Sequence, residues 1–169
     1  GGINTHDETT LVAGVDPSEE QRAAFESHWD TPTYPDLDEL FSTHTPDIVC
    51  ISTPTETHVE TVTTAIDAGV DGILCEKPLA PTRTAANRLV DRCEETETAL
   101  VVNYTRRFVP GCRRVAEHLS NGGIGTPHTA QVLYTKEFLE NGSHMIDLAR
   151  WWFGDAKTVE KHRVDDTVH

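Results

Sequence analysis

Short apolar segments alternate with segments of helical periodicity along the first 120 or so residues of the chain. The apolar segments predict strands at 11–15, 47–52, 72–76 and 99–102. A capping-box pattern, Ser18-Glu-Glu-Gln21, predicts a helix at about 18–27, and a short helix is expected at 36–41. Apolar residues at helical spacing predict helices at about 55–69, 82–95 and 110–121. Strands that are apolar throughout are typical of a parallel sheet with helices on both faces. The pattern therefore predicts the α/β fold class.

The pattern changes after residue 123. An alternating segment at 128–134 predicts a strand, an apolar stripe at 141–153 predicts a helix, and 157–164 predicts one more strand. We interpret residues 1–122 as a partial first domain and 123–169 as the beginning of a second α/β domain. The first residue is Gly rather than Met and the predicted sheet is small, so we expect the chain to be incomplete at both ends.

Acidic residues outnumber basic ones 28 to 14, and the formal charge is −14. This charge argues against nucleic acid and against anionic membranes as partners, since both need clustered Lys and Arg. No apolar segment approaches the roughly 20 residues that a membrane-spanning helix needs. The four cysteines show no C-x-x-C spacing, so we expect buried, reduced thiols and a cytoplasmic location.

Most of the basic residues are arginines, since only four of the fourteen are lysines. A surface rich in Asp and Glu and poor in Lys suits a salt-rich cytoplasm, where ions screen the repulsion between like charges. A halophilic, haloarchaeal source is therefore our hypothesis.

Polar residues follow each predicted strand of the first domain. They are Asp16, Thr53 with Pro54, Glu76 with Lys77, and Asn103. Ligands of open α/β sheets bind outside the carboxyl ends of the strands, so this set predicts a nucleotide-binding crevice. Asp16 is followed by Pro-Ser-Glu-Glu, where a 2′-phosphate would meet three carboxylates, which favours NAD over NADP. A plain turn aspartate is the alternative for Asp16.

Two other places carry candidate chemistry. Pro78 disfavours a helical backbone at Lys77 and so holds it extended. A lysine at the mouth of a cleft can donate a hydrogen bond to a substrate oxygen. The alternative is an ordinary surface lysine in a loop. His144 and Asp147 are three residues apart on one predicted helix, so the acid could orient the histidine as a general base. A capping or surface pair is the alternative there.

Three further residues keep two interpretations each. His58 could face a cofactor or could only bond the start of its own helix. Arg106 and Arg107 could bind a polar or anionic substrate or could be a solvated pair.

The chain resembles the Gfo/Idh/MocA family of NAD(P)-dependent oxidoreductases. Five segments carry the resemblance: Leu-Val-Ala-Gly-Val-Asp-Pro at 11–17, Ile-Ser-Thr-Pro-Thr-Glu-Thr-His at 51–58, Cys-Glu-Lys-Pro-Leu-Ala at 75–80, Asn-Tyr-Thr-Arg-Arg-Phe at 103–108, and Asn-Gly-Ser-His-Met-Ile-Asp-Leu-Ala-Arg-Trp-Trp-Phe-Gly at 141–154. The resemblance implies a Rossmann domain followed by an α/β domain with a large open sheet.

The resemblance also implies roles for single residues. The cofactor-binding residues would be Asp16, Thr53, Pro54, His58, Glu76 and Asn103. Among them, Asp16 would bind the adenosine ribose and Glu76 the nicotinamide-side ribose. Lys77 would be the catalytic lysine, His144 the proton-transfer histidine and Asp147 a supporting acid.

The chain departs from the family pattern at two points. No G-x-G-x-x-G loop occurs in the sequence, so the Rossmann-like sheet should lack its first strand and its pyrophosphate cradle, and these residues alone should bind NAD weakly. Many family members also carry an Asp four residues before the histidine, where this chain has Glu140.

The function that follows is hydride transfer between NAD, or less favourably NADP, and a carbinol carbon of a sugar or cyclitol. The expected partner is a small polyol or sugar, and a homo-oligomer stays open. One alternative is a non-catalytic binding or assembly module that keeps the sheet without the phosphate loop. Another is a metal hydrolase that uses Glu140, His144 and Asp147, although the histidines show no zinc-ligand spacing.

Overall fold

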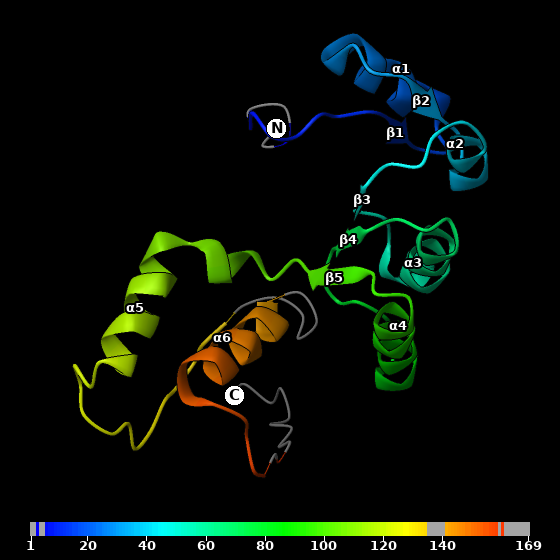
Figure 1. The fold of residues 1–169 in the computed structure, drawn as a ribbon. Helices are drawn as coiled ribbons and strands as arrows, with labels where there is room; N and C mark the ends of the chain where they lie inside the picture. The colour runs from blue at the N-terminus through cyan, green and yellow to red at the C-terminus, as the bar shows by residue number, and fades with distance from the viewer. Residues whose placement is uncertain (1–2, 4–5, 135–140, 159, 161–169) are drawn as a thin grey trace, which may run out of the picture. The chain divides into compact units, whose positions relative to one another are not determined.

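The computed structural model describes residues 3, 6–134, 141–158 and 160 (Figure 1). The chain forms two compact units, residues 1–103 and residues 104–169. Across the described part of the chain, no helix is long and apolar enough to cross a membrane.

The first unit alternates strands with helices, as the pattern predicted. Its elements are β1 (Gly14–Val15), α1 (Glu19–Trp29), β2 (Thr33–Tyr34), α2 (Leu37–Thr43), β3 (Ile48–Ile51), the 3₁₀ turn η2 (Thr55–Thr57), α3 (His58–Asp67), β4 (Gly72–Cys75), α4 (Arg83–Glu95) and β5 (Ala99–Val102). The strands form a parallel pair β1–β2 and a parallel sheet β3–β4–β5. The α/β class is therefore confirmed, and β2 is a strand that the sequence pattern did not predict.

Side-chain caps begin three of these helices at the residues that precede them. The oxygens of Ser18, Asp36 and Thr82 accept hydrogen bonds from the third following amide, which satisfies one of the free N–H groups of the first turn. Gly69 ends the segment after α3 with a φ of 79°, a conformation that favours glycine. The polar residues between the apolar segments thus fix where the helices start and stop.

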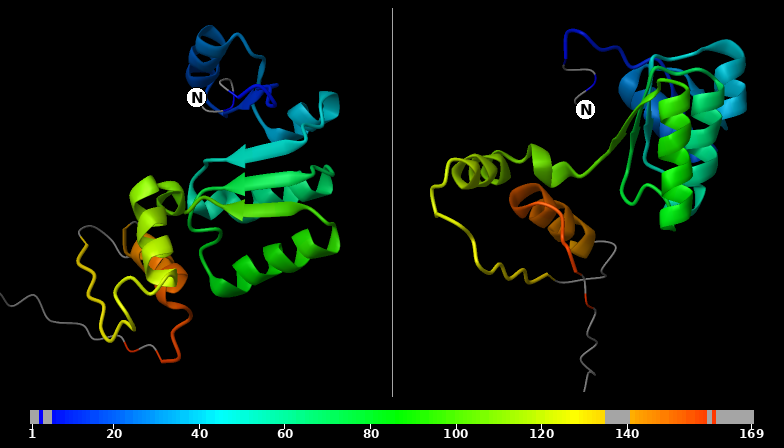
Figure 2. Two further views of the ribbon diagram at one scale, coloured as in Figure 1. Left: turned by 60° about the vertical axis from the view of Figure 1, so that its left-hand side comes forward. Right: turned by 60° about the horizontal axis from the view of Figure 1, so that its bottom comes forward.

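The core of the first unit lies between the β3–β4–β5 sheet and the helices α3 and α4, which Figure 2 shows on one side of that sheet. The strands contribute Val49, Ile51, Ile73, Cys75, Leu100 and Val102 to this core. The helices contribute Val62, Ala65 and Ile66 from α3 and Leu89 and Cys93 from α4. Each helix therefore buries most of the stripe that its apolar spacing predicted, except that Val90 of α4 is 40% exposed.

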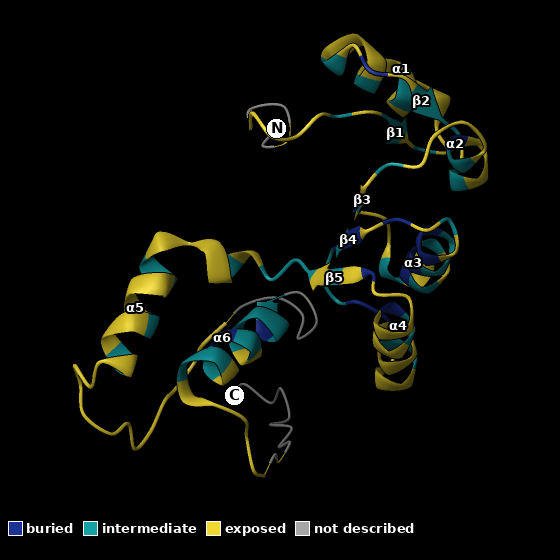
Figure 3. Ribbon diagram, in the orientation of Figure 1, coloured by how far each residue is buried: buried dark blue, intermediate teal, exposed yellow. Residues whose placement is uncertain are grey.

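The other face of the same sheet is not covered by the described residues. Ile48 is 60% exposed, Val101 is 48% exposed and Cys50 is exposed, and the strand register places all three on this face. Figure 3 shows exposed residues in β5. The prediction of helices on both faces is therefore wrong for the described residues. The strands β3, β4 and β5 are apolar along their whole length, and their side chains point alternately to the two faces of the sheet. The helices α3 and α4 cover only one of these faces.

The cysteines do not all fit the prediction of buried thiols. Cys75 and Cys93 are buried, Cys112 is half-buried, and Cys50 is exposed because it belongs to the uncovered face. Burial, and then the adjacent carboxylate of Glu76, raise the pKa of Cys75 to about 11, so this thiol stays protonated at neutral pH.

The described residues of the second unit are helical or irregular. Its elements are the 3₁₀ turn η3 (Thr105–Phe108), α5 (Pro110–Ser120) and α6 (Ser143–Phe153), and α5 packs against α6. The strand predicted at 128–134 is wrong, since these residues are irregular and exposed and the described part of this unit offers no strand for them to pair with. The predicted strand at 157–164 lies largely outside the described residues, and the domain boundary at 122/123 stays a prediction.

We predict that Ile73→Ala lowers the free energy of unfolding of the 169-residue chain by about 3 kcal/mol, because it leaves a cavity in the core. Ile73 is 2% exposed in the central strand. The matched control is Ile48→Ala on the uncovered face of β3, with an expected change within about 0.5 kcal/mol. Urea unfolding measures both, and equal losses would mean that the uncovered face is packed in solution.

Candidate functional site

The three strands of the larger sheet end at the same level. Ile51, Cys75 and Val102 are partners in the register, and the ladder continues one step beyond them. The amide of Glu76 donates to the carbonyl of Ile51 at 2.9 Å, and the amide of Asn103 donates to the carbonyl of Cys75 at 2.7 Å. The residues that follow β4 and β5 therefore leave the sheet side by side.

The side chains of Glu76 and Asn103 are joined to each other. The Asn103 amide nitrogen, Nδ2, donates to Glu76 Oε1 at 2.6 Å, and both residues are half-buried. The structure thus brings together two of the predicted cofactor-binding residues, which lie 27 positions apart in the sequence. A hydrogen bond to a carboxylate is stronger than one between neutral groups, so this contact holds the ends of β4 and β5 together.

His58 joins the loop after β3 to the loop after β4. Its side chain is among the largest fully buried ones, at 1% exposed. Nε2 lies 2.9 Å from the carbonyl oxygen of Thr53, and Nδ1 lies 2.9 Å from the carbonyl oxygen of Pro78. The buried ring therefore spans the two loops, and its predicted place in a cofactor groove stays a prediction.

Lys77 lies between Glu76 and Pro78, and each of these two residues makes one of the hydrogen bonds described above. Its neighbour Glu76 is bonded to Asn103, and its other neighbour, Pro78, is bonded to His58. The Lys77–Pro78 peptide bond is cis, and Lys77 itself is half-buried. Thr53 and Pro54 are exposed on the neighbouring loop, where the hydroxyl of Thr57 lies 2.9 Å from that of Thr53. The backbone that presents Lys77 is thus held on both sides.

Asp16 follows β1 directly and belongs to the separate two-stranded sheet. Its Oδ1 accepts a hydrogen bond from the amide of Ser18 at 2.8 Å. Arg22 reaches back from α1, and its Nη1 donates to the carbonyl oxygens of Asp16 at 2.8 Å and Pro17 at 3.1 Å. A cation therefore lies beside Asp16, which the sequence analysis did not anticipate because it considered only the residues directly after the acid.

His144 and Asp147 lie in the second unit, in the first two turns of α6. Both oxygens of Asp147 accept hydrogen bonds from Arg107 of η3, one from Nε and one from Nη2, each at 2.7 Å. The guanidinium of Arg107 also lies 5.7 Å from the ring centre of Trp151. Arg107 is thus paired with a carboxylate while its side chain is 43% exposed, and the two interpretations of Arg106 and Arg107 stay predictions.

Tyr104 completes this group of side chains. Its ring meets the His144 ring edge to face, with ring centres 5.9 Å apart. Burial, together with the nearby carboxylate of Asp147, raises the pKa of the Tyr104 phenol above its ordinary value, and Arg107 partly offsets the effect. At neutral pH the phenol is therefore a neutral hydrogen-bond donor rather than a base.

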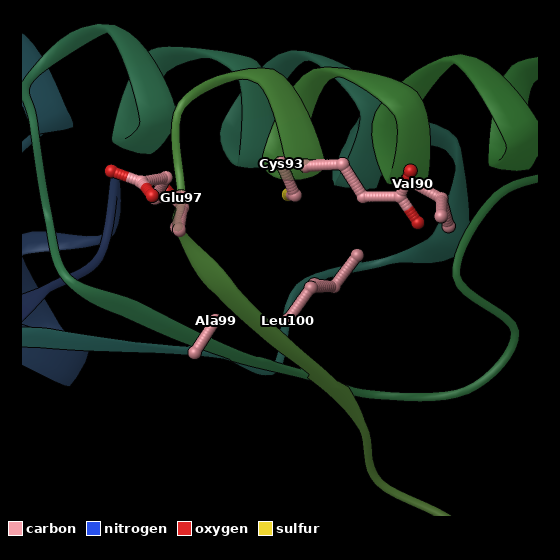
Figure 4. Close-up of a pocket in the computed structure, with 7 residues that line it drawn as sticks. Val90, Cys93, Glu97, Ala99 and Leu100 are labelled. Atoms are coloured by element: carbon pink, nitrogen blue, oxygen red, sulfur yellow. The ribbon is translucent and has the colours of Figure 1, made fainter.

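A shallow hollow of about 340 Å³ lies elsewhere in the first unit, between α4 and β5 (Figure 4). Cys93 and Leu100 face each other across it, and Glu97 lies at its rim. Thr98 and Ala99 line it at the amino end of β5, whereas ligands of such sheets bind at the carboxyl ends. We therefore assign the hollow no part in the candidate site.

Glu140 is outside the described residues. Within the described ranges, no three His, Cys, Asp or Glu side chains form a group that could hold a metal ion.

The comparisons with known proteins agree on one family. Residues 2–104 match the model of the GFO_IDH_MocA oxidoreductase family, described as having an NAD-binding Rossmann fold. D-apiose dehydrogenase of Paraburkholderia graminis is 32% identical over 167 residues, which cover 88% of this chain and 44% of that protein. Myo-inositol 2-dehydrogenase of Thermotoga maritima is 28% identical, with 80% of this chain and 44% of that protein covered. The chain thus spans less than half the length of these relatives.

A solved structure shows the same fold. An oxidoreductase from Agrobacterium radiobacter, in complex with NAD⁺, L-tartaric acid and magnesium, superposes with a TM-score of 0.84. The match covers 98% of this chain and 54% of that one, at 22% sequence identity.

We predict that His58→Leu lowers the free energy of unfolding by about 3 kcal/mol, because the fully buried ring and its polar contacts with the carbonyl groups of Thr53 and Pro78 are lost. The control is His28→Leu at an exposed position of α1, with an expected change within about 0.5 kcal/mol. Urea unfolding of the two variants measures the difference. A His58→Leu variant as stable as the control would show that the ring does not hold the two loops.

Proposed function

The chain belongs to the Gfo/Idh/MocA family of oxidoreductases with an NAD-binding Rossmann fold, and from this premise we propose its function. We infer that it supplies the cofactor-binding strand ends and the proton-transfer residues of a dehydrogenase. The proposed reaction moves a hydride between NAD and a carbinol carbon of a sugar or cyclitol. The relatives named as D-apiose and myo-inositol dehydrogenases support this substrate class, whereas none of the comparisons supports the assembly-module alternative.

One observation carries the proposal, namely the hydrogen-bonded set at the carboxyl ends of β3, β4 and β5. Glu76 is bonded to Asn103 and His58 to the Pro78 carbonyl, so the backbone on both sides of Lys77 is tethered. Catalysis requires a donor held in a fixed geometry toward its substrate. A lysine whose two neighbours are both hydrogen-bonded meets that requirement better than a lysine in an unrestrained loop.

The residues present fit NAD in part. Asp16 at the end of β1 would accept hydrogen bonds from the adenosine ribose hydroxyls, and Glu76 and Asn103 would lie on the nicotinamide side, beside Thr53 and Pro54. The pyrophosphate has no glycine-rich loop to bind among the 169 residues. We therefore propose NAD as the cofactor of the full-length enzyme and expect weak binding to these residues alone.

The proton chemistry falls to the chain's own side chains. Bound NAD would supply the hydride acceptor at the nicotinamide ring. The Lys77 ammonium would donate a hydrogen bond to the substrate oxygen, and the His144 imidazole would take up the hydroxyl proton. A homo-oligomeric assembly remains part of the proposal, without a role in this chemistry.

We predict that Lys77→Ala in the full-length enzyme lowers kcat about 1000-fold, the scale of a lost general acid–base group, and leaves NAD affinity within about threefold. The control is Lys157→Ala, which removes an exposed lysine outside the candidate site and should keep full turnover. Steady-state kinetics and NAD titration measure the two effects. Near wild-type turnover of Lys77→Ala would remove the proposed role.

We predict that Asp16→Asn raises the Kd for NAD about tenfold and changes the Kd for NADP much less. The substitution removes the carboxylate that bonds the ribose and leaves the Arg22 guanidinium nearby, which favours a 2′-phosphate. Asp38→Asn, which neutralises an exposed acid in the first turn of α2, is the control and should keep the preference for NAD. An unchanged preference in Asp16→Asn would contradict the ribose contact.

A further inference from the structure

The ion pair of Arg107 and Asp147 joins η3 to α6. Two parallel hydrogen bonds of 2.7 Å join the guanidinium to the carboxylate. The side chain of Asp147 is 12% exposed and that of Arg107 is 43% exposed. A carboxylate so far removed from water needs a cation with matching geometry, and a two-pronged guanidinium provides it.

This pairing changes what Asp147 can do for its neighbour. The carboxylate balances the charge of Arg107, so it offers little net negative charge to stabilise an imidazolium at His144. The side chain of Asp147 also fixes the position of η3 against α6, because the two parallel hydrogen bonds with Arg107, here called the fork, constrain both distance and angle.

The consequence of that fixed position is visible at His144. Tyr104 directly precedes η3, and its ring meets the His144 ring at an angle of 88° between planes. On the other side of the pair, the Trp151 ring lies against the Arg107 guanidinium, one turn beyond Asp147 on α6. The Arg107–Asp147 pair therefore lies between two aromatic contacts, that of Tyr104 with His144 and that of Trp151 with Arg107.

We propose that Asp147 is a positioning residue that acts through Arg107. The pair anchors η3 to α6 and so holds Tyr104 against His144, rather than supplying the acid that supports proton transfer. This assignment replaces the supporting-acid role that the family resemblance implies for Asp147. It rests on the proposed function only where His144 is taken as the proton-transfer residue.

The variants Arg107→Gln, Asp147→Asn and the double variant test the proposal. In the full-length enzyme, each single variant should lower kcat by on the order of tenfold, and the double variant should lose no more than one single variant does. The substrate KM should stay within about threefold, since the proposal gives neither residue a contact with the substrate. If Asp147 acts directly on His144, Asp147→Asn would lose far more kcat than Arg107→Gln, and that result would overturn the proposal.

Arg107→Lys tests the fork itself, because lysine keeps the charge but cannot form two parallel bonds. It should lose as much kcat as Arg107→Gln, and full recovery would show that charge alone matters. The matched control is Asp155→Asn, which breaks the exposed Arg150–Asp155 pair and should leave kcat unchanged.

A structural measurement keeps this proposal separate from the proposed function. The nuclear Overhauser contact between the Tyr104 and His144 rings should be present in the 169-residue chain without cofactor and lost in Asp147→Asn and Arg107→Gln. A contact that persists in both variants overturns the proposal. A full-length protein without dehydrogenase activity would overturn the proposed function and leave this measurement to decide the role of Asp147.

Discussion

The in-register pairing of three parallel strands is the constraint on which the first unit depends. Because Ile51, Cys75 and Val102 lie level in the sheet, the residues that follow them leave it together. The Glu76–Asn103 bond exists only because this register places the two side chains at one edge. A shift of one residue in either strand would turn each side chain to the opposite face and end the contact.

Much of this arrangement could be predicted from the sequence, because apolar strands and amphipathic helices carry strong local signals. The helix α4 illustrates this, since Thr82 caps it and Leu89 and Cys93 are buried as their spacing predicted. The strand β2 was missed because two residues, Thr33 and Tyr34, are too short a segment to show a period. The alternating segment at 128–134 was taken for a strand because alternation is local, whereas a strand exists only with a partner.

The candidate site divides in the same way. Asp16, Glu76, Lys77 and Asn103 could be predicted as candidates because each lies at the end of a predictable strand, and their roles stay predictions. The contact of His58 with the Pro78 carbonyl, 20 residues away, could not, since it depends on how two loops fold over a buried ring. The pairing of Arg107 with Asp147 spans 40 residues and was equally hidden. A signal existed in retrospect, because an acid among the apolar residues of α6 requires a cation when the helix packs.

The His58 contacts of the first unit and the Arg107–Asp147 pair of the second should differ in their response to salt. In the first unit, His58 contacts backbone carbonyls while fully buried, so mobile ions have little access to it. The Arg107–Asp147 pair has charge on both sides and a half-exposed guanidinium, which ions screen more readily. In concentrated salt an ordinary surface ion pair contributes almost nothing to stability. The burial of Asp147 and the two-pronged geometry reduce that loss, since hydrogen bonds and a water-poor surrounding persist when long-range attraction is screened. A forked, partly buried pair is therefore the form of charged contact that can still hold η3 to α6 under such conditions.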